Sequence, residues 1–144
     1  MTDPVTDPAA ALRDAGLRVT ESRLAVFAAL AAHPHASAEA VYAEVAGGLP
    51  KSSRQSVYNA LNDFVDASLV RRIEPAGQPM LFELRVDDNH HHLVCTSCGR
   101  VEDVECAVGA APCLHPSDHH GFRIAVAEVT YWGLCGTCAA EAAA

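Results

Sequence analysis

Two Cys-x-x-Cys knuckles constrain this sequence more than any other feature. They are Cys95-Thr-Ser-Cys98 and Cys135-Gly-Thr-Cys138, and 36 residues separate them. Such a segment turns tightly enough for both sulfurs to bind one ion, and two segments complete the tetrahedral four-sulfur shell that Zn²⁺ prefers. Because four thiolates leave no open coordination position, we expect a structural zinc that contributes directly to folding.

Other uses of these cysteines fit less well. The opening residues MTDPVTDP include two acids and two prolines but no basic residue, unlike a secretory or transit peptide. No apolar run approaches the roughly 18 residues of a membrane span. We therefore expect a cytoplasmic protein without a membrane partner, in which thiols stay reduced. A dithiol redox enzyme is also disfavoured, since thioredoxin-like Cys-x-x-Cys motifs come singly.

Charge and metal-binding residues divide the chain into two unlike halves. The net charge of −8 argues at first against a nucleic-acid partner. However, residues 9–73 hold seven basic and six acidic side chains, whereas residues 86–144 hold two and eight. All six cysteines and six of the eight histidines also lie in the second half. We therefore expect a nearly neutral first module and an acidic, metal-binding second module.

Helix signals followed by a hairpin signal characterise the first module. Thr20, Ser37 and Ser53 are N-cap candidates, each before an apolar pattern of helical period. Two short β-like runs, 69–74 and 80–85, flank a turn rich in proline and glycine. Helices followed by a hairpin with arginines on its first strand indicate a winged helix-turn-helix over residues 1–85.

The second module has a mixed pattern. Short strand candidates at 92–95 and 100–104 flank the first knuckle, a longer one covers 123–132, and the alanine-rich end predicts a frayed helix. The predicted fold class is therefore α+β. The winged helix-turn-helix leads through a hinge at 86–89 into a small α/β domain at 90–144 that contains the four-cysteine zinc site.

Three consecutive histidines, His90, His91 and His92, follow the predicted hinge. In an extended strand His90 and His92 project to one face and His91 to the other. Together with Glu83 upstream and Asp103 downstream, the two imidazoles form a mixed nitrogen and oxygen set, which suits Fe²⁺, Mn²⁺ or Zn²⁺. We therefore expect a second metal site at this boundary.

Cys106 and Cys113 belong neither to the two knuckles nor to the mixed nitrogen and oxygen set. Three interpretations stay open for them: small core residues, a reversible disulfide switch, or ligands of an auxiliary metal site.

Together these motifs resemble the ferric uptake regulator (Fur) family of metal-sensing bacterial repressors. The resemblance rests on AGLRVTESR, HASAEAVY, SVYNAL, LFEL, NHHHLVCTSCG and CGTC. The segments CAVGAAPCL and VTYWGLC are most similar to the FurA/CatR group, which is associated with control of catalase-peroxidase genes and related to the peroxide sensor PerR. The resemblance implies a homodimeric DNA-binding repressor of the bacterial cytoplasm, which is not an enzyme, and assigns dimerisation to the α/β domain.

The resemblance also implies a set of ligands for a regulatory metal. These are His35, Glu83, His90, His92 and Asp103. His35 enters through the resemblance alone, because His33 is an equal candidate from the residues themselves. Aspartate at position 103 is typical of PerR-type sensors, where iron sensors often carry glutamate.

An extra metal site of some family members is not expected here. Two of its ligand positions are occupied by Asn89 and Ala127 in this sequence.

The implied mechanism couples metal binding to DNA binding. Because the ligands come from both modules, the metal favours a closed form that sets the two recognition helices of a dimer at half-site spacing. The regulatory ion is expected to be Fe²⁺ or Mn²⁺, and Zn²⁺ can replace it in vitro. With Fe²⁺, the expected response to peroxide is oxidation of His35 or His90 to 2-oxo-histidine. The alternatives are iron-responsive control of iron-uptake genes and oxidation of thiols, either those of the zinc site or Cys106 and Cys113.

Polar side chains on the helix that Ser53 opens are predicted to contact DNA. If Val57 faces the core, Gln55 and Asn59 lie one turn apart on the exposed side, with Tyr58 and Asn62 at its edge. Amide side chains can bond adenine and tyrosine can pack on thymine methyls, so we expect an A·T-rich inverted repeat. The candidate contacts are Arg18, Lys51, Arg54, Gln55, Ser56, Tyr58, Asn59, Arg71 and Arg72. Family members commonly carry arginine in place of Asn59, and a basic residue at the position of Arg18 enters the minor groove.

A zinc hydrolase is the alternative from another class, with Glu83 or Glu102 as the base. It is disfavoured because the sequence has no His-Glu-x-x-His motif and because this function leaves the winged-helix half unused.

Overall fold

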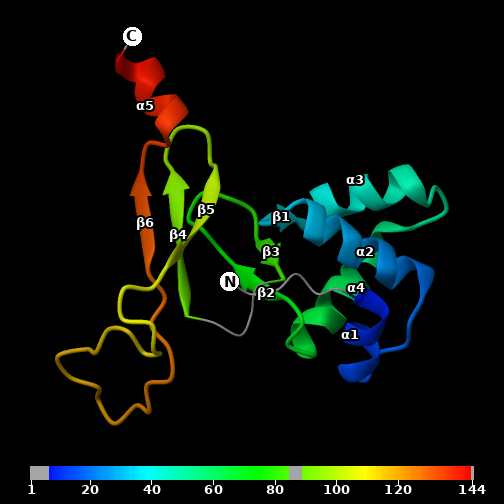
Figure 1. The fold of residues 1–144 in the computed structure, drawn as a ribbon, viewed down its shortest axis with the longest axis horizontal. Coiled ribbons are helices and arrows are strands. Elements are labelled where there is room, and N and C mark those ends of the chain that lie inside the picture. The colour runs from blue at the N-terminus through cyan, green and yellow to red at the C-terminus, as the bar shows by residue number, and fades with distance from the viewer. Residues whose placement is uncertain (1–6, 85–88, 144) are drawn as a thin grey trace. The chain divides into compact units, whose positions relative to one another are not determined.

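The computed structural model describes residues 7–84 and 89–143, which form two compact units, residues 1–86 and 87–144 (Figure 1). The first unit holds four helices and a small sheet, and the second holds three strands and a final helix. Residues 86–88 of the predicted hinge lie outside the described residues. The mixture of helices and small sheets confirms the predicted α+β class.

Local capping explains where the helices of the first unit begin. The side chains of Thr20, Ser37 and Ser53 accept hydrogen bonds from the backbone N–H three residues later, as predicted. Asp7 caps a fourth helix that the sequence analysis did not predict. The helices are α1 (Pro8–Asp14), α2 (Glu21–Ala32), α3 (Ala38–Gly48) and α4 (Arg54–Asp66).

The predicted hairpin is present with shorter strands than expected. It consists of β2 (Arg71–Ile73) and β3 (Leu81–Glu83), and the two-residue β1 (Ala36–Ser37) pairs with the other side of β3, antiparallel throughout. Leu69 and Val70 do not join the strand predicted over 69–74, because their N–H groups donate to the Phe64 carbonyl at the end of α4.

The core of the first unit forms where the helices meet. Phe27 of α2 and Phe64 of α4 pack edge to face with ring centroids 6.3 Å apart, and both are buried. Leu12 of α1 is fully buried in the same cluster. The hydrophobic effect therefore holds α1 in place as well as the three predicted helices.

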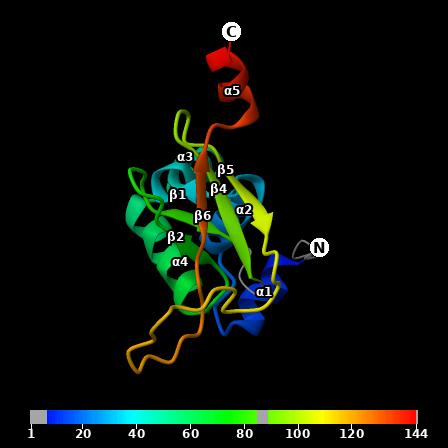
Figure 2. The same cartoon turned by 90° about the vertical axis from the view of Figure 1, so that its left-hand side faces the viewer.

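The second unit is built around a three-stranded sheet. Its strands are β4 (His90–Cys95), β5 (Val101–Glu105) and β6 (Thr130–Gly133), and its helix is α5 (Gly136–Ala143). Strand β4 lies in the middle, antiparallel to β5 and parallel to β6 (Figure 2). This arrangement brings the two knuckles, which follow β4 and β6, to the same end of the sheet.

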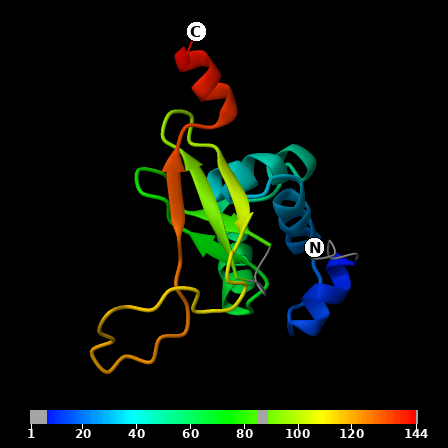
Figure 3. The same cartoon turned by 60° about the vertical axis from the view of Figure 1, so that its left-hand side comes forward.

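The prediction of a long strand over 123–132 is wrong in extent. Residues 106–129, all of them described, contain no strand and form the loop that extends beyond the sheet in Figure 3. The pairing between β4 and β6 begins at Thr130. The Val129 carbonyl still accepts from the His92 N–H group, but the Val129 N–H group donates to the imidazole Nδ1 of His91 and does not extend the ladder. In the described part of the chain, no helix is long and apolar enough to cross a membrane.

Candidate metal centres and recognition helix

The four knuckle cysteines converge on one point in the second unit. Their Sγ atoms all lie within 4.8 Å of one another, and the sulfurs of Cys98 and Cys135 are 3.8 Å apart. A tetrahedron with Zn–S bonds of about 2.3 Å has edges of about 3.8 Å. The parallel register, which sets Cys95 opposite Gly133, brings the second knuckle beside the first. The sulfur spacing therefore fits a zinc ion.

Hydrogen bonds shift the pKa values of Cys95 and Cys138 in opposite directions. The N–H groups of Cys135 and Cys98 each donate to Cys95 Sγ at 3.4 Å, and they lower the pKa of Cys95 to about 6. By contrast, the hydrogen bond with Cys135 raises the pKa of Cys138 to about 12. Four sulfurs this close cannot all lose their protons without a compensating positive charge, which is what a divalent cation supplies.

The three histidines alternate across β4, as predicted. The Nε2 atoms of His90 and His92 lie 3.5 Å and 3.3 Å from Asp103 Oδ1, and their rings pack edge to face. His92 and Asp103 are direct partners in the β4–β5 ladder. Both imidazoles are buried, so the second unit presents two nitrogens and one carboxylate as a compact candidate ligand group.

The first unit contains its own candidate pair. His35 Nε2 lies 3.0 Å from Glu83 Oε2, and both side chains are less than 10% exposed. His35 precedes β1 and adopts φ 65°, a left-handed conformation that is uncommon outside glycine. His33, the equal candidate from sequence, instead lies on the surface 3.4 Å from Glu44. The structure therefore brings His35, and not His33, to Glu83.

The side chains of α4 are buried and exposed as the sequence predicts. Val57 is fully buried, whereas Gln55 and Asn59 are exposed on the opposite side. Gln55 Nε2 donates to Asn59 Oδ1 at 2.8 Å, so the two amides form one hydrogen-bonding surface. Lys51 and Arg72 are also exposed.

Glu39 of α3 is a participant that the sequence analysis missed. The Tyr58 hydroxyl donates to Glu39 Oε1 at 2.9 Å, and Arg54 Nε lies 3.2 Å from the same oxygen. The guanidinium of Arg54 also stacks over the ring of Tyr42 at 4.7 Å. The hydrogen bond with Arg54 lowers the pKa of Glu39, and its ionised carboxylate holds two of the predicted DNA contacts. Helical periodicity describes the faces of a single helix, so it could not predict this contact between α3 and α4.

The remaining DNA candidates occupy different surroundings. Exposed Arg18 borders a shallow groove that also includes Ser56 and Asn59 of α4. The carbonyl of Arg18 accepts from Arg23, which in turn pairs with Asp63 at 2.9 Å. These contacts tie the segment before α2 to α4. Ser56 Oγ donates to the Ser53 carbonyl within the first turn.

Arg71 is less exposed than the other arginines predicted to contact DNA. Its Nε lies 4.0 Å from Glu83 Oε1, and its side chain is only 22% exposed. The carboxylate at this distance belongs to a candidate metal ligand on β3.

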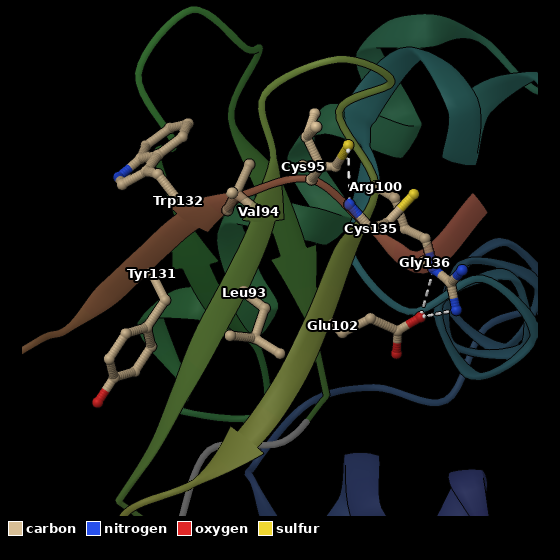
Figure 4. Close-up of a pocket in the computed structure, with 11 residues that line it drawn as sticks. Leu93, Val94, Cys95, Arg100, Glu102, Tyr131, Trp132, Cys135 and Gly136 are labelled. Atoms are coloured by element: carbon tan, nitrogen blue, oxygen red, sulfur yellow. Dashed lines mark hydrogen bonds and ion pairs between the residues drawn. The ribbon is translucent and has the colours of Figure 1, made fainter. Parts of the chain in front are cut away.

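An exposed apolar surface on the second unit also escaped the sequence analysis. Leu93, Tyr131 and Trp132 are each roughly half exposed and line an open pocket next to the first knuckle (Figure 4). Glu102 lies on the rim of this pocket, where it accepts a hydrogen bond from Arg100 Nε at 2.6 Å. Glu102 pairs with Leu93 across the strands, so it lies on the opposite face from His92 and is not placed to act as a base there.

Cys106 and Cys113 lie near His91, whose side chain is on the opposite face of β4 from His90 and His92. The six cysteines therefore fall into two groups, the four knuckle cysteines and the pair Cys106 and Cys113.

The family model, the similar sequences and the similar structures all belong to bacterial regulators of one kind. The model of the "Ferric uptake regulator family" matches residues 14–131. The "Transcriptional regulator FurA" of Mycobacterium tuberculosis is 54% identical over 134 residues, which cover 93% of this chain and 91% of that protein. The ferric uptake regulator from Pseudomonas aeruginosa, solved with manganese, aligns with TM-score 0.66 and 27% identity over 90% of this chain and 98% of that one. The Campylobacter jejuni peroxide stress regulator aligns with TM-score 0.64 and 25% identity over 90% and 94%.

Proposed function

The chain belongs to the ferric uptake regulator family, and we propose that it is a metal-dependent DNA-binding repressor that responds to peroxide. Its relatives are transcriptional regulators, so the chain is a regulator and not an enzyme. The genes that it controls are expected to encode catalase-peroxidase or other defences against oxidative stress. The alternative within the family is an iron-responsive repressor of iron-uptake genes.

The observation that carries the proposal is two carboxylate–imidazole groups, in which Glu83, His90 and His92 are buried and Asp103 is partly exposed. Glu83 lies against His35 in the first unit, and Asp103 lies against His90 and His92 in the second. Buried polar groups of this kind are costly unless they are paired or bind a metal. The five side chains offer nitrogen and oxygen donors, which suit Fe²⁺ or Mn²⁺ and can also accept Zn²⁺.

Sharing one ion between the two units would couple metal binding to DNA binding. His35 and Glu83 belong to the unit that carries α4, whereas the other three ligands belong to the unit with the exposed apolar surface. Metal binding then favours arrangements in which both units supply ligands, because a ligand shifts an equilibrium only by its preference for one state. The relative from Pseudomonas aeruginosa was solved with manganese, which supports a divalent ion of this kind.

The peroxide response is assigned to the histidines of this site. If Fe²⁺ is held there, it would supply the electrons that reduce peroxide to an oxidant of nearby imidazoles. His35 and His90 are the expected targets, and an oxidised ring is a poorer ligand, so DNA binding is lost. Likeness to a peroxide stress regulator supports a peroxide response, and likeness to the ferric uptake regulator from Pseudomonas aeruginosa supports the iron-responsive alternative.

A structural Zn²⁺ at Cys95, Cys98, Cys135 and Cys138 completes the proposed metal content. The sulfur spacing and the depressed pKa of Cys95 support it. A site with four protein ligands has no open position for substrate, so it stabilises the second unit rather than taking part in the response.

The exposed apolar surface of the second unit is assigned to a second copy of the chain. Large exposed apolar side chains that line one pocket, as Leu93, Tyr131 and Trp132 do, are typical of a surface that another protein covers. A two-fold dimer presents two copies of α4, which fits an inverted repeat with A·T-rich half-sites. Gln55 and Asn59 are the base-reading candidates, and the arginines and Lys51 are candidates for phosphate contacts.

Fluorescence anisotropy with an A·T-rich inverted repeat, selected from a random pool, tests the coupling. The zinc-containing protein should bind tightly with Mn²⁺ and weakly without it, and His90→Ala should bind weakly in both conditions. Operator binding by His90→Ala that equals the wild type with Mn²⁺ would contradict the proposal.

A further inference from the structure

His91 belongs to a second cluster in the same unit, which the proposed regulatory site does not use. Its Nε2 atom lies 3.2 Å from Cys113 Sγ, and the ligand-type atoms of His91, Cys106 and Cys113 all lie within 4.8 Å of one another. His91 is 3% exposed, whereas both cysteines are partly exposed. A buried imidazole therefore lies against two thiols that a small molecule can reach.

Hydrogen bonding determines which nitrogen of His91 carries the proton. The backbone N–H of Val129 donates to Nδ1 at 3.3 Å, and a nitrogen that accepts carries no proton in the neutral ring. The proton is then on Nε2, from where it is donated to Cys113 Sγ. A metal bound at Nε2 would force the proton onto Nδ1, facing the Val129 N–H group. The geometry therefore favours thiol chemistry over an auxiliary metal ion.

Cys106 is the sulfur toward which most donors point. Asn89 Nδ2 donates to Cys106 Sγ at 3.3 Å and is itself oriented by the Ala110 carbonyl at 3.1 Å. The N–H groups of Gly109 and Val108 and the Cys113 thiol lower the pKa of Cys106, which favours its thiolate. Residues 107–111 are exposed, so a dissolved oxidant can reach this sulfur.

Cys113 has a hydrogen-bond acceptor beside its S–H group. Its Sγ lies 3.9 Å from the Ala127 carbonyl, an oxygen to which a thiol can donate and a thiolate cannot. The Nε2–H group of His91 then orients this sulfur beside Cys106. The two cysteines thus differ as an attacking thiolate and a resolving thiol do in a peroxide-reactive pair.

We propose that Cys106 and Cys113 form a peroxide-reactive dithiol that closes into a disulfide, with Cys106 attacking and Cys113 resolving. The Cys106 thiolate forms an S–O bond with one oxygen of hydrogen peroxide while the O–O bond breaks, and the leaving hydroxide is protonated to water. Cys113 sulfur then attacks the sulfenic sulfur of Cys106, the S–O bond breaks, and the hydroxide leaves as water with the Cys113 proton. Two thiols and one peroxide give one disulfide and two waters.

Closure requires only local movement. The sulfurs must approach from within 4.8 Å to about 2.05 Å, and the intervening residues 107–112 carry no strand pairing that would have to break. Asn89 and His91 are positioning residues, since they act through hydrogen bonds to the sulfurs. The pair does not require the regulatory metal, so it can function even if the proposed iron chemistry is absent.

Trypsin isolates this pair for a direct test. Cleavage after Arg100 and Arg123 gives the peptide 101–123, which contains Cys106 and Cys113 and no knuckle cysteine. The reduced, zinc-containing full chain, free of iron and manganese, is treated with hydrogen peroxide, blocked with N-ethylmaleimide and digested. We expect this peptide to lose both maleimide adducts and to be about 2 Da lighter than the free dithiol, while the knuckle peptides stay reduced.

Single substitutions test the order of the two steps. In Cys113→Ser, dimedone should trap a sulfenic acid on Cys106, whereas Cys106→Ser should react at least about tenfold more slowly at Cys113. Asn89→Leu should slow the first step, and His91→Phe should slow disulfide closure after sulfenic acid has formed. Zinc content of one ion per chain verifies that each variant is folded. Retention of both adducts in 101–123, or faster loss from the knuckle peptides, would overturn the proposal, as would equal reactivity of the two serine variants.

Discussion

His92 Nε2 lies 3.3 Å from Asp103 Oδ1 because the two residues are direct partners in the antiparallel pair of β4 and β5. His90, two residues earlier on the same face, reaches the same carboxylate oxygen. Strand pairing therefore sets the geometry of these three side chains before any ion binds. Substitutions here should change metal binding without changing the fold.

Asp103→Asn tests the carboxylate directly. An amide keeps the size of the side chain but loses the negative charge, so we expect the affinity for Mn²⁺ to fall at least about tenfold in a metal titration. Glu102→Gln is the matched control, because Glu102 is the neighbouring carboxylate on the opposite face and pairs with Arg100. Equal Mn²⁺ affinity in the two variants would remove Asp103 from the ligand set.

Glu39→Gln should strengthen DNA binding. It removes a negative charge that holds Arg54 and Tyr58 away from other partners, so Arg54 gains freedom to contact phosphate. We expect severalfold tighter binding and a salt dependence steeper by about one phosphate contact. Glu44→Gln, which changes a carboxylate on the same helix that pairs with His33, should have little effect. Weaker binding by Glu39→Gln would instead show that Glu39 orients Arg54 for DNA.

The acidity of Cys95 predicts how the second unit responds to pH. Its pKa is lowered in the folded chain from about 9 to about 6, so in the metal-free protein its contribution to stability is present above pH 9 and is lost as pH falls toward 6. Denaturant titrations of the metal-free chain across this range check the sign.

The same acidity limits proton release on zinc binding. At about pH 7.5 Cys95 has already lost its proton, so zinc should displace fewer than four protons per chain. Calorimetry in buffers with different ionisation enthalpies measures this number. Release of four protons would show that Cys95 remains a thiol in the metal-free chain.

Trp132→Glu tests the assignment of the apolar surface to a second copy. A charge at this half-exposed position should weaken self-association at least about tenfold in sedimentation experiments, while zinc content stays at one per chain. Val19→Glu places the same charge at an exposed apolar position of the first unit and should leave association unchanged. Unaltered self-association of Trp132→Glu would move the interface elsewhere.

Local signals in the sequence predicted much of the fold. Thr20, Ser37 and Ser53 cap helices because their hydroxyls satisfy N–H groups within the same turn, which is a property of neighbouring residues. The alternation of His90, His91 and His92 likewise follows from strand geometry alone. The knuckle spacing predicted four sulfurs around one point.

What the sequence could not predict depends on contacts between distant segments. The contact of Glu39 with Tyr58 joins two helices, and the bond from Val129 to His91 ends a ladder that the pattern over 123–132 had predicted to be longer. The difference between His33 and His35 also depends on Glu83, which lies on a strand far along the chain. Helix α1 did have a local signal, Asp7 followed by Pro8 and alanines, which was not interpreted as a cap.

Mass spectrometry of the iron-loaded protein after peroxide treatment tests the central claim most directly. Trypsin places His35 in peptide 24–51 and His90 in peptide 86–100. With Fe²⁺ we predict a gain of about 16 Da on His35 or His90, located by fragmentation, in step with loss of operator binding, and with Mn²⁺ neither change. Loss of operator binding with both histidines unmodified, or full operator binding after peroxide, would contradict the account.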